Sequence, residues 1–191
     1  MDAGEVVIAP VLCGPVGLYA QLWRAGGRYR MDWDLPFDKR YKESHRFEIA
    51  DVRGRTVLTV PIAKPESRRC TWGDIMVSAH DEWWDKHRIA LESAYGRTPY
   101  FEFLIDRFMP MLRGTVMETH PRLRDLAEGW DAGIRSVLEM WGEPAGASDE
   151  ACGEVRYWQL REPELGFIGG LSVLDLIFNM GPESGGVLVK G

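Results

Sequence analysis

The sequence predicts an α+β (mixed α/β) fold, and three observations support this. Short apolar runs of the strand type fall mainly in the first half of the chain, and the apolar spacing becomes helical from residue 81 onward. The closing segment, residues 157–182, holds a strand-like run followed by a helical pattern with capping residues. We therefore expect a mixed sheet with an N-terminal βαβ unit, a β-hairpin, and a helical second half whose last strand and helix return to the sheet.

The bulk composition is that of an ordinary globular domain. The chain has 191 residues, of which 45% are hydrophobic and 27% charged, so we expect a single domain over residues 1–191. The net charge of −6 disfavours a nucleic-acid partner, and no apolar run approaches the ~20 residues of a transmembrane helix. Three cysteines without a CxxC pair fit a reducing compartment, so the sequence predicts a cytoplasmic protein.

The first predicted unit lies near the N-terminus. Val6–Ala9 is a short apolar run suited to a buried strand, and a turn with two glycines follows at residues 13–17. The next apolar residues share one helical face up to Gly26, where glycine is expected to end the helix. In Arg28–Trp33, polar and apolar residues alternate, which predicts a second strand. This order of elements predicts a βαβ unit with a right-handed crossover.

A β-hairpin is predicted next, within residues 47–63. Two strand-like runs flank a turn at residues 52–55, and the second run, Val57–Ile62, is strongly β-branched. Pro61 limits that run to an end or an edge of a sheet. Ile75–Ser78 is a further short strand candidate.

Three helices are predicted between residues 81 and 142. The first is expected to have Asp81 as its N-cap and to end at Gly96, where a C-terminal glycine belongs. The second would begin at Thr98 and run to about Met109. The third opens at residues 119–121 and keeps an apolar stripe to Gly142.

The end of the chain is more apolar than most termini. Residues 143–154 are acidic and rich in small side chains, which predicts a surface loop. Tyr157–Leu160 is then predicted to form a strand. Ser172 with Asp175 three residues later resembles a capping box, and residues 179–182 end that helix.

His87 is the first residue with candidate chemistry. Trp83, His87 and Leu91 share one helical face, which is apolar and should point inward. The spacing favours a core histidine with one hydrogen-bond partner. The alternative is a general base or a substrate-binding donor at the rim of the core. No second histidine stands at metal-ligand spacing, so we expect no metal site.

A basic run at residues 38–46 (DKRYKESHR) stands out in this acidic chain. It carries Lys39, Arg40, Lys42 and Arg46. Such a run can be a solvated strand edge that positive charge protects from aggregation. It can equally be an anion-binding rim for a phosphate or a carboxylate.

Two glycine turns and a cysteine complete the candidates. Residues 14–17 and 169–172 each open a predicted helix, where exposed N–H groups can bind an anion. Neither matches a nucleotide-binding motif, so each taken separately is read as an ordinary tight turn. Cys13 lies between a strand and a helix start, a position that suits a nucleophile, but a small buried residue is the favoured interpretation.

Several motifs occur in an order that resembles a known family. They are the VLTVPI strand at residues 57–62, Trp83-x-x-x-His87, Ser93-Ala94-Tyr95, Thr98-Pro99-Tyr100-Phe101, YWQ at 157–159 and LSVLDLIFNMGP at 171–182. Together these motifs span the chain from about residue 38 to residue 182. They are similar to those of the WbqC-like family of bacterial proteins, whose closing motif reads YYQVF…GF.PNLSIIDLLFN.GP.

The resemblance implies a function in surface-polysaccharide assembly. It implies acyl or aminoacyl (glycyl) transfer to a nucleotide-linked amino sugar, which is a small-molecule substrate of O-antigen biosynthesis. His87 would be the general base, and Asp175 and Asn179 would orient it or hydrogen-bond the sugar. Arg46, with Lys39 or Arg40, would bind phosphate. The aromatic wall of such a pocket would consist of Trp83, Tyr95, Tyr157 and Trp158.

The chain also departs from the family pattern. The family's YRNR element falls on residues 43–46, where only Arg46 persists, and the Asn of its PNLS element is Gly170. The family's N-terminal YFPP falls on residues 11–15 (VLCGP). The departures at residues 43–45 favour the alternative, a non-catalytic ligand- or partner-binding protein of the same fold in envelope biogenesis. The sequence leaves the cofactor and the oligomeric state open.

Overall fold

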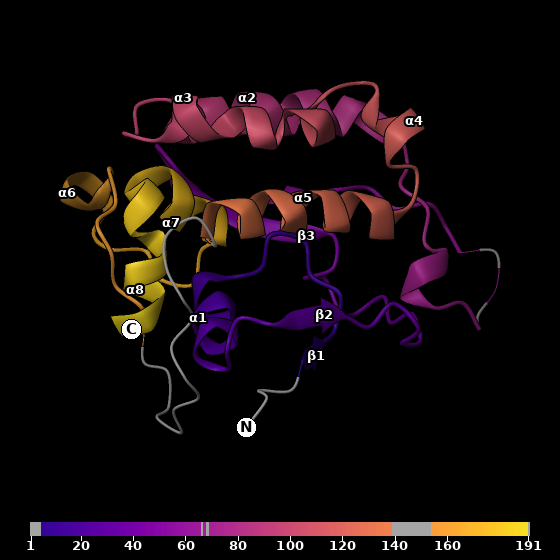
Figure 1. The fold of residues 1–191 in the computed structure, drawn as a ribbon. Coiled ribbons are helices and arrows are strands. Elements are labelled where there is room, and N and C mark those ends of the chain that lie inside the picture. The colour runs from indigo at the N-terminus through magenta and orange to yellow at the C-terminus, as the bar shows by residue number, and fades with distance from the viewer. Residues whose placement is uncertain (1–4, 66, 68, 139–153, 191) are drawn as a thin grey trace.

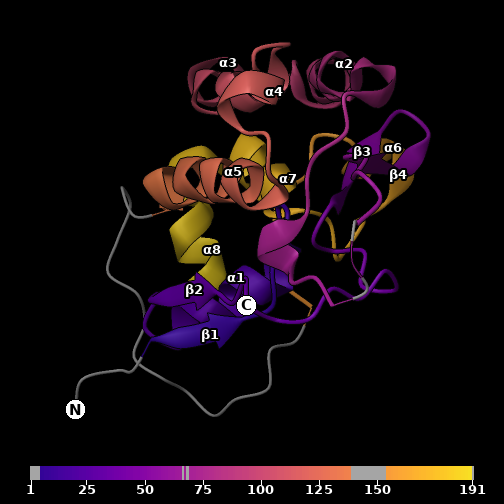
Figure 2. The same ribbon diagram turned by 90° about the vertical axis from the view of Figure 1, so that its right-hand side faces the viewer.

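The computed structural model describes residues 5–65, 67, 69–138 and 154–190. Its helices and small sheets confirm the predicted α+β class. Figures 1 and 2 show an upper layer of helices, a middle layer around α5 (Leu123–Leu138) and α7 (Val173–Met180), and an N-terminal unit below them. The predicted loop at 143–154 lies outside the described residues except for Glu154.

The predicted βαβ unit is confirmed. Strand β1 (Val6–Ile8), helix α1 (Val16–Arg24) and strand β2 (Tyr29–Met31) follow one another, and the two strands pair in parallel. The helix ends before Gly26 and Gly27, which both have a positive φ that glycine adopts without strain.

The predicted hairpin is also confirmed, but it does not join the N-terminal strands. Strands β3 (Arg46–Asp51) and β4 (Gly54–Thr59) pair in antiparallel register around a two-residue turn. In the described residues the structure holds two separate two-stranded sheets, so the single mixed sheet that we expected is wrong. Figure 2 shows the hairpin to one side of β1 and β2. The candidate strand at Ile75–Ser78 forms only isolated bridges.

The helical region differs from the prediction at its first two helices. Asp81 and Glu82 have φ angles of 69° and 45°, so Asp81 is not an N-cap and α2 begins at Trp83. The predicted second helix is a four-residue α3 followed by two 3₁₀ turns. The bounds of the helices from this region are α2 (Trp83–Tyr95), α3 (Phe101–Leu104), α4 (Val116–Thr119) and α5, with 3₁₀ turns at Trp72–Asp74, His80–Glu82, Ile105–Arg107 and Met109–Leu112.

The closing segment returns to the core, but not as a strand. Tyr157–Leu160 has no strand partner, which corrects the predicted last strand. Helix α7 is capped as predicted, since Ser172 Oγ accepts from the Leu174 N–H. The capping box does not form, because the Asp175 carboxylate instead accepts hydrogen bonds from Tyr157 and Gln159. The remaining helices are α6 (Glu162–Leu165) and α8 (Ser184–Lys190), with a 3₁₀ turn at Gly181–Glu183.

The core is built around aromatic side chains of the helical layers. Phe108 stacks on Trp130 of α5 with ring centroids 5.1 Å apart, and it also contacts Phe178 of α7. All α7 residues from Val173 to Asn179 are buried. The apolar end of the chain is therefore part of the core, and α7 anchors the turn that precedes it.

Candidate functional site

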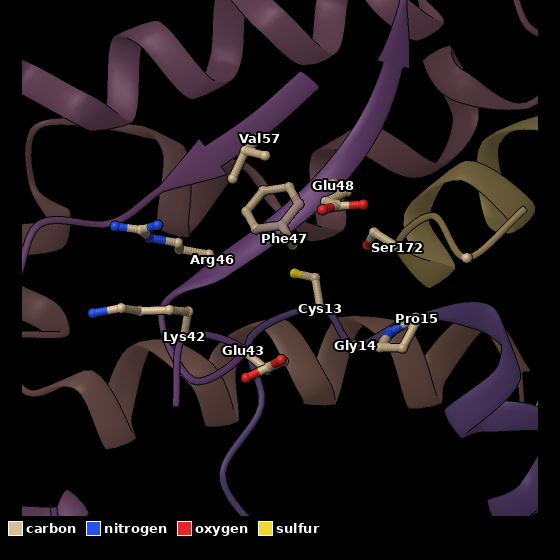
Figure 3. Close-up of a pocket in the computed structure, with 11 residues that line it drawn as sticks. Cys13, Gly14, Pro15, Lys42, Glu43, Arg46, Phe47, Glu48, Val57 and Ser172 are labelled. Atoms are coloured by element: carbon tan, nitrogen blue, oxygen red, sulfur yellow. The ribbon is translucent and has the colours of Figure 1, made fainter. Parts of the chain in front are cut away.

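A pocket of about 340 Å³ lies beside the hairpin, and we call it the hairpin pocket (Figure 3). It forms where the loop before α1, the basic run and hairpin, and the turn before α7 meet. Its lining residues are Cys13, Gly14, Pro15, Lys42, Glu43, Arg46, Phe47, Glu48, Val57, Gly170 and Ser172.

Main-chain hydrogen bonds between distant segments build the walls of the hairpin pocket. The Val16 N–H donates to Leu171 O at 2.9 Å, and the Val173 N–H donates to Gly14 O at 2.9 Å. The Ser172 N–H donates to Glu48 O at 2.8 Å and ties the same turn to β3. The two glycine turns of the sequence, more than 150 residues apart, therefore lie side by side at one pocket.

The charges of the hairpin pocket are separated. Within the described part of the chain, the side chains of Lys42 and Arg46 make no ion pair or hydrogen bond, and in Figure 3 they extend toward the same side. Glu48 and Ser172 lie together on the other side of that view. Arg55 pairs with Glu48 and also donates to Gly169 O at 2.6 Å. One end of the pocket thus carries the two cations and the other the Glu48 carboxylate, and a second carboxylate, Glu43, also lines the pocket.

Cys13 lines the hairpin pocket but is not an activated nucleophile. The residue is 3% exposed, and its φ of 49° is in the left-handed region. Burial, with a smaller contribution from Asp131, raises the pKa of its thiol well above the usual value. The thiol is therefore protonated at neutral pH, which favours the structural interpretation of Cys13.

Lys39 and Arg40 lie outside the residues that line the hairpin pocket. Both are exposed, and Arg40 forms an ion pair with Asp38 at 2.8 Å. Arg46, Lys39 and Arg40 were the three cations expected to bind phosphate, and only Arg46 lines the hairpin pocket. Lys42 is the second cation there.

His87 lines a different pocket of about 290 Å³, which we call the edge pocket because it runs along β4. Its Nε2 is 3.2 Å from Thr59 O, and its ring contacts those of Phe47 and Trp83. Burial lowers the pKa of His87 to about 4, although the bond to Thr59 opposes this shift. The residues lining the edge pocket are Val57, Leu58, Thr59, Pro61, His80, Asp81, Trp83, Lys86 and His87.

Asp175 and Asn179 belong to a third group of polar residues, which we call the clasp: Tyr157, Gln159, Asp175 and Asn179. The Tyr157 hydroxyl and Gln159 Nε2 donate to Asp175 Oδ2 at 2.7 and 3.0 Å. Asn179 Oδ1 accepts from the Leu160 N–H at 3.0 Å. Burial raises the pKa of Asp175, and its hydrogen bonds to Tyr157, Tyr95 and Gln159 oppose that rise.

The clasp leaves little room for a ligand. Its local cavity is about 10 Å³, close to the volume needed for one water molecule. Gln159 fixes the segment further, because its amide both donates to Ile168 O and accepts from the Ile168 N–H at 2.9 Å. The clasp therefore holds the segment before α7 against that helix.

The predicted site residues thus occupy separate places. Arg46 lines the hairpin pocket, Trp83 and His87 line the edge pocket, and Tyr95, Asp175 and Asn179 line the cavity at the clasp. The candidates at other places are Tyr157 in the clasp, the exposed Lys39 and Arg40, and Trp158, which is 47% exposed.

Sequence reasoning did not assign Lys42, Glu48 or Gln159 to a site. Lys42 was visible in the basic run. Glu48 and Gln159 carried no separate signal of their roles.

Comparison with known proteins gives one match. The model of the WbqC-like protein family matches residues 33–140, more than half of the chain. The chain belongs to this family. No curated protein and no solved structure matches it.

The WbqC-like match divides the hairpin pocket. Residues 33–140 include the basic run, the hairpin and α2, and so hold Lys42, Arg46 and His87. The Cys13–Pro15 loop and the turn at Gly170–Ser172 lie outside the matched range. The two cations and the Glu48 carboxylate are therefore within the WbqC-like region, and the walls formed by the Cys13–Pro15 loop and the Gly170–Ser172 turn come from the flanking segments.

The described residues contain neither a cluster of metal ligands nor a membrane-spanning helix. There, no three His, Cys, Asp or Glu side chains gather as a metal site would require. The described helices are also too short or too polar to cross a lipid bilayer.

Proposed function

We propose that this WbqC-like protein binds a phosphate-bearing small molecule in the hairpin pocket and acts there as a transferase. The reaction would be acyl or aminoacyl (glycyl) transfer to a nucleotide-linked amino sugar in surface-polysaccharide (O-antigen) biosynthesis. The observation that carries this proposal is the pair of cations, Lys42 and Arg46, which line one pocket without a partner among the described residues. Its cysteine pattern fits a cytoplasmic enzyme.

The separated charges of the hairpin pocket fit such a substrate. A guanidinium and an ammonium group are common ligands of phosphate oxygens. Glu48 would face the amino group of the sugar, where a carboxylate favours an ammonium ion and can accept its proton. The free amine would then attack the acyl carbonyl, and the carbon–sulfur or carbon–oxygen bond to the donor's leaving group would break. The second proton of the nitrogen would depart with that leaving group, which leaves a neutral amide. Arg55 would hold Glu48 in place through their ion pair.

His87 has no step in this proposal. It lines the edge pocket rather than the hairpin pocket, and burial lowers its pKa to about 4.

A second candidate is a non-catalytic ligand-binding protein of the same family, acting in envelope biogenesis. One observation favours it: burial moves the pKa of both Cys13 and His87 away from neutrality, in the direction that makes each group less reactive. This candidate keeps the phosphate-binding end of the pocket but lacks turnover. Product formation distinguishes the two.

Calorimetry with inorganic pyrophosphate and with UDP-glucosamine tests the binding step. We expect Lys42→Ala and Arg46→Ala each to weaken binding by about 10- to 100-fold, as expected for hydrogen bonds to charged groups. Lys39→Ala and Arg40→Ala are matched controls, because these cations do not line the pocket. They should change the affinity by less than about twofold. Equal losses at all four positions, or no binding by the wild type, would contradict the proposal.

Mass spectrometry of the sugar tests the transfer step. Incubation of UDP-glucosamine with a glycyl thioester should add one glycyl group to the amine, and Glu48→Gln should abolish this gain while binding persists. Binding without product over any donor supports the second candidate instead.

A further inference from the structure

The outer edge of β4 presents unpaired main-chain groups. In antiparallel pairs, hydrogen-bonded residues alternate with residues whose N–H and C=O point away from the partner strand. The Val60 N–H donates to His45 O, so the next pairs that point outward are Arg46–Thr59 and Glu48–Val57. The bond from Ser172 to Glu48 O on the other edge of the hairpin agrees with this alternation.

One of these outward groups on β4 is already satisfied. Thr59 O accepts from His87, whose ring takes the place of a neighbouring strand at that point. The N–H and C=O of Val57 make no hydrogen bond within the described residues. Val57 therefore offers a donor and an acceptor side by side at a strand edge, as edge residues do.

The edge pocket lies beside these groups and is mostly neutral. Leu58, Pro61 and Trp83 give it apolar walls. Its two exposed charges, Lys86 and Asp81, pair with each other. The pocket therefore suits a flat, uncharged group with polar atoms on one edge.

The edge pocket and the hairpin pocket adjoin each other. Val57 lines both of them, and it is the cross-strand partner of Glu48. Thr59 of the edge pocket is likewise opposite Arg46 of the hairpin pocket. Side chains of such pairs lie roughly 5 Å apart. A ligand whose phosphate contacts Arg46 can therefore extend over the hairpin face into the edge pocket.

We propose that the edge pocket is the subsite for a planar heterocycle, carried by the same ligand whose phosphate binds Lys42 and Arg46. This inference rests on the proposed function. The heterocycle would place an adjacent donor and acceptor, as nucleobases carry, against the C=O and N–H of Val57. The Trp83 and Pro61 side of the pocket would contact its face.

Val57→Pro tests the subsite directly. Proline removes the outward N–H without touching the bonds between β3 and β4, and edge strands tolerate it at such positions. With ADP and UDP as probes in calorimetry, we expect the affinity for at least one to fall about tenfold, the effect of one lost hydrogen-bonding pair. The affinity for inorganic pyrophosphate should stay within about twofold. Val52→Thr, at an exposed turn residue of the same hairpin that lines neither pocket, is the control and should bind all three probes as the wild type does.

The outcomes separate this inference from the proposed function. If pyrophosphate binding depends on Lys42 and Arg46 while Val57→Pro binds ADP and UDP normally, the subsite is wrong and the proposed function stands. If pyrophosphate does not bind, the proposed function fails and the subsite falls with it. If Val57→Pro does not fold, the NMR amide resonance of Val57 in the wild type is measured during titration with each probe instead. A shift of this resonance with UDP or ADP but not with pyrophosphate supports the subsite. No shift with either nucleotide would overturn it.

Discussion

The clasp and the hairpin pocket are both rich in polar side chains, but they use them in opposite ways. In the clasp, the Asp175 carboxylate and both side-chain ends of Gln159 have partners within the chain, and the cavity is about 10 Å³. In the hairpin pocket, Lys42 and Arg46 have no such partner in the described residues, beside a cavity of about 340 Å³.

This difference separates residues that specify the fold from residues available to a ligand. A buried polar group must be hydrogen-bonded, and when the chain itself satisfies it, the group fixes one arrangement of segments. Cations left without partners at the rim of a pocket can bind an anion instead. Asp175 and Asn179, which the closing motif made conspicuous, fall in the first class, and Arg46 falls in the second.

The largest expected effect that tests this contrast is on stability, at Asp175. Asp175→Ala would leave the buried donors of Tyr157 and Gln159 without an acceptor. We expect the free energy of unfolding to fall by about 3–5 kcal/mol, measured by urea denaturation. Asp175→Asn keeps one acceptor oxygen and should lose less than half as much.

Lys42→Ala is the comparison variant from the hairpin pocket. Lys42 is half-buried, but its side chain makes no hydrogen bond or ion pair with the described residues, so the stability should stay within about 0.5 kcal/mol of the wild type. An Asp175→Ala protein as stable as the wild type but unable to bind pyrophosphate would break the contrast, since Asp175 would then act on the ligand.

The second expected effect is a loss of stability in mild acid. Burial lowers the pKa of His87 and of His45 from 6.5 to about 4, and nearby Arg46 and Lys42 contribute at His45. The unfolded chain therefore binds protons that the folded chain excludes. The stabilisation is fully present above pH 6.5 and is lost as the pH falls toward 4. For His87 the loss is on the order of 2 kcal/mol between about pH 6.5 and 5.

His87→Gln separates the contribution of that residue. A glutamine amide can still donate to Thr59 O but does not titrate, so the slope of unfolding free energy against pH should become shallower, with the His45 part remaining. His80→Gln is the control, because His80 is exposed. An unchanged slope in His87→Gln would mean that His87 is not a buried neutral histidine.

The sequence predicted the local elements better than their assembly. The βαβ unit, the hairpin and the Ser172 cap follow from apolar periodicity and capping residues, which are local signals. Tyr157–Leu160 has the composition of a strand, but the Asn179 side chain takes the place of a partner strand at Leu160. That exchange depends on tertiary contacts and has no local signature.

The candidate site was predictable in its parts and not in its arrangement. The basic run and the two glycine turns were each recognised, and each alone had an ordinary explanation. Their meeting depends on hydrogen bonds such as that from Val16 to Leu171, between segments far apart in the chain. Lys42 and Lys39 belong to the same basic run, and only their positions relative to β3 distinguish them. The sequence alone could therefore not show which of the two lysines lines the pocket.

The smallest expected effect concerns Arg55, which connects the two regions. Its guanidinium pairs with Glu48 of the hairpin pocket and donates to Gly169 O, one residue after the Ile168 that Gln159 of the clasp holds. Both side chains of the ion pair are more than a third exposed, so Arg55→Gln should cost no more than about 1 kcal/mol of stability. The Glu48 carboxylate and the turn at Gly170 would lose a shared restraint, and we expect pyrophosphate affinity to change by less than about threefold, while UDP-glucosamine affinity falls further. Calorimetry with both probes checks this. If the two affinities fall equally, Arg55 contributes only its positive charge, and the carboxylate end of the pocket is set independently of the clasp.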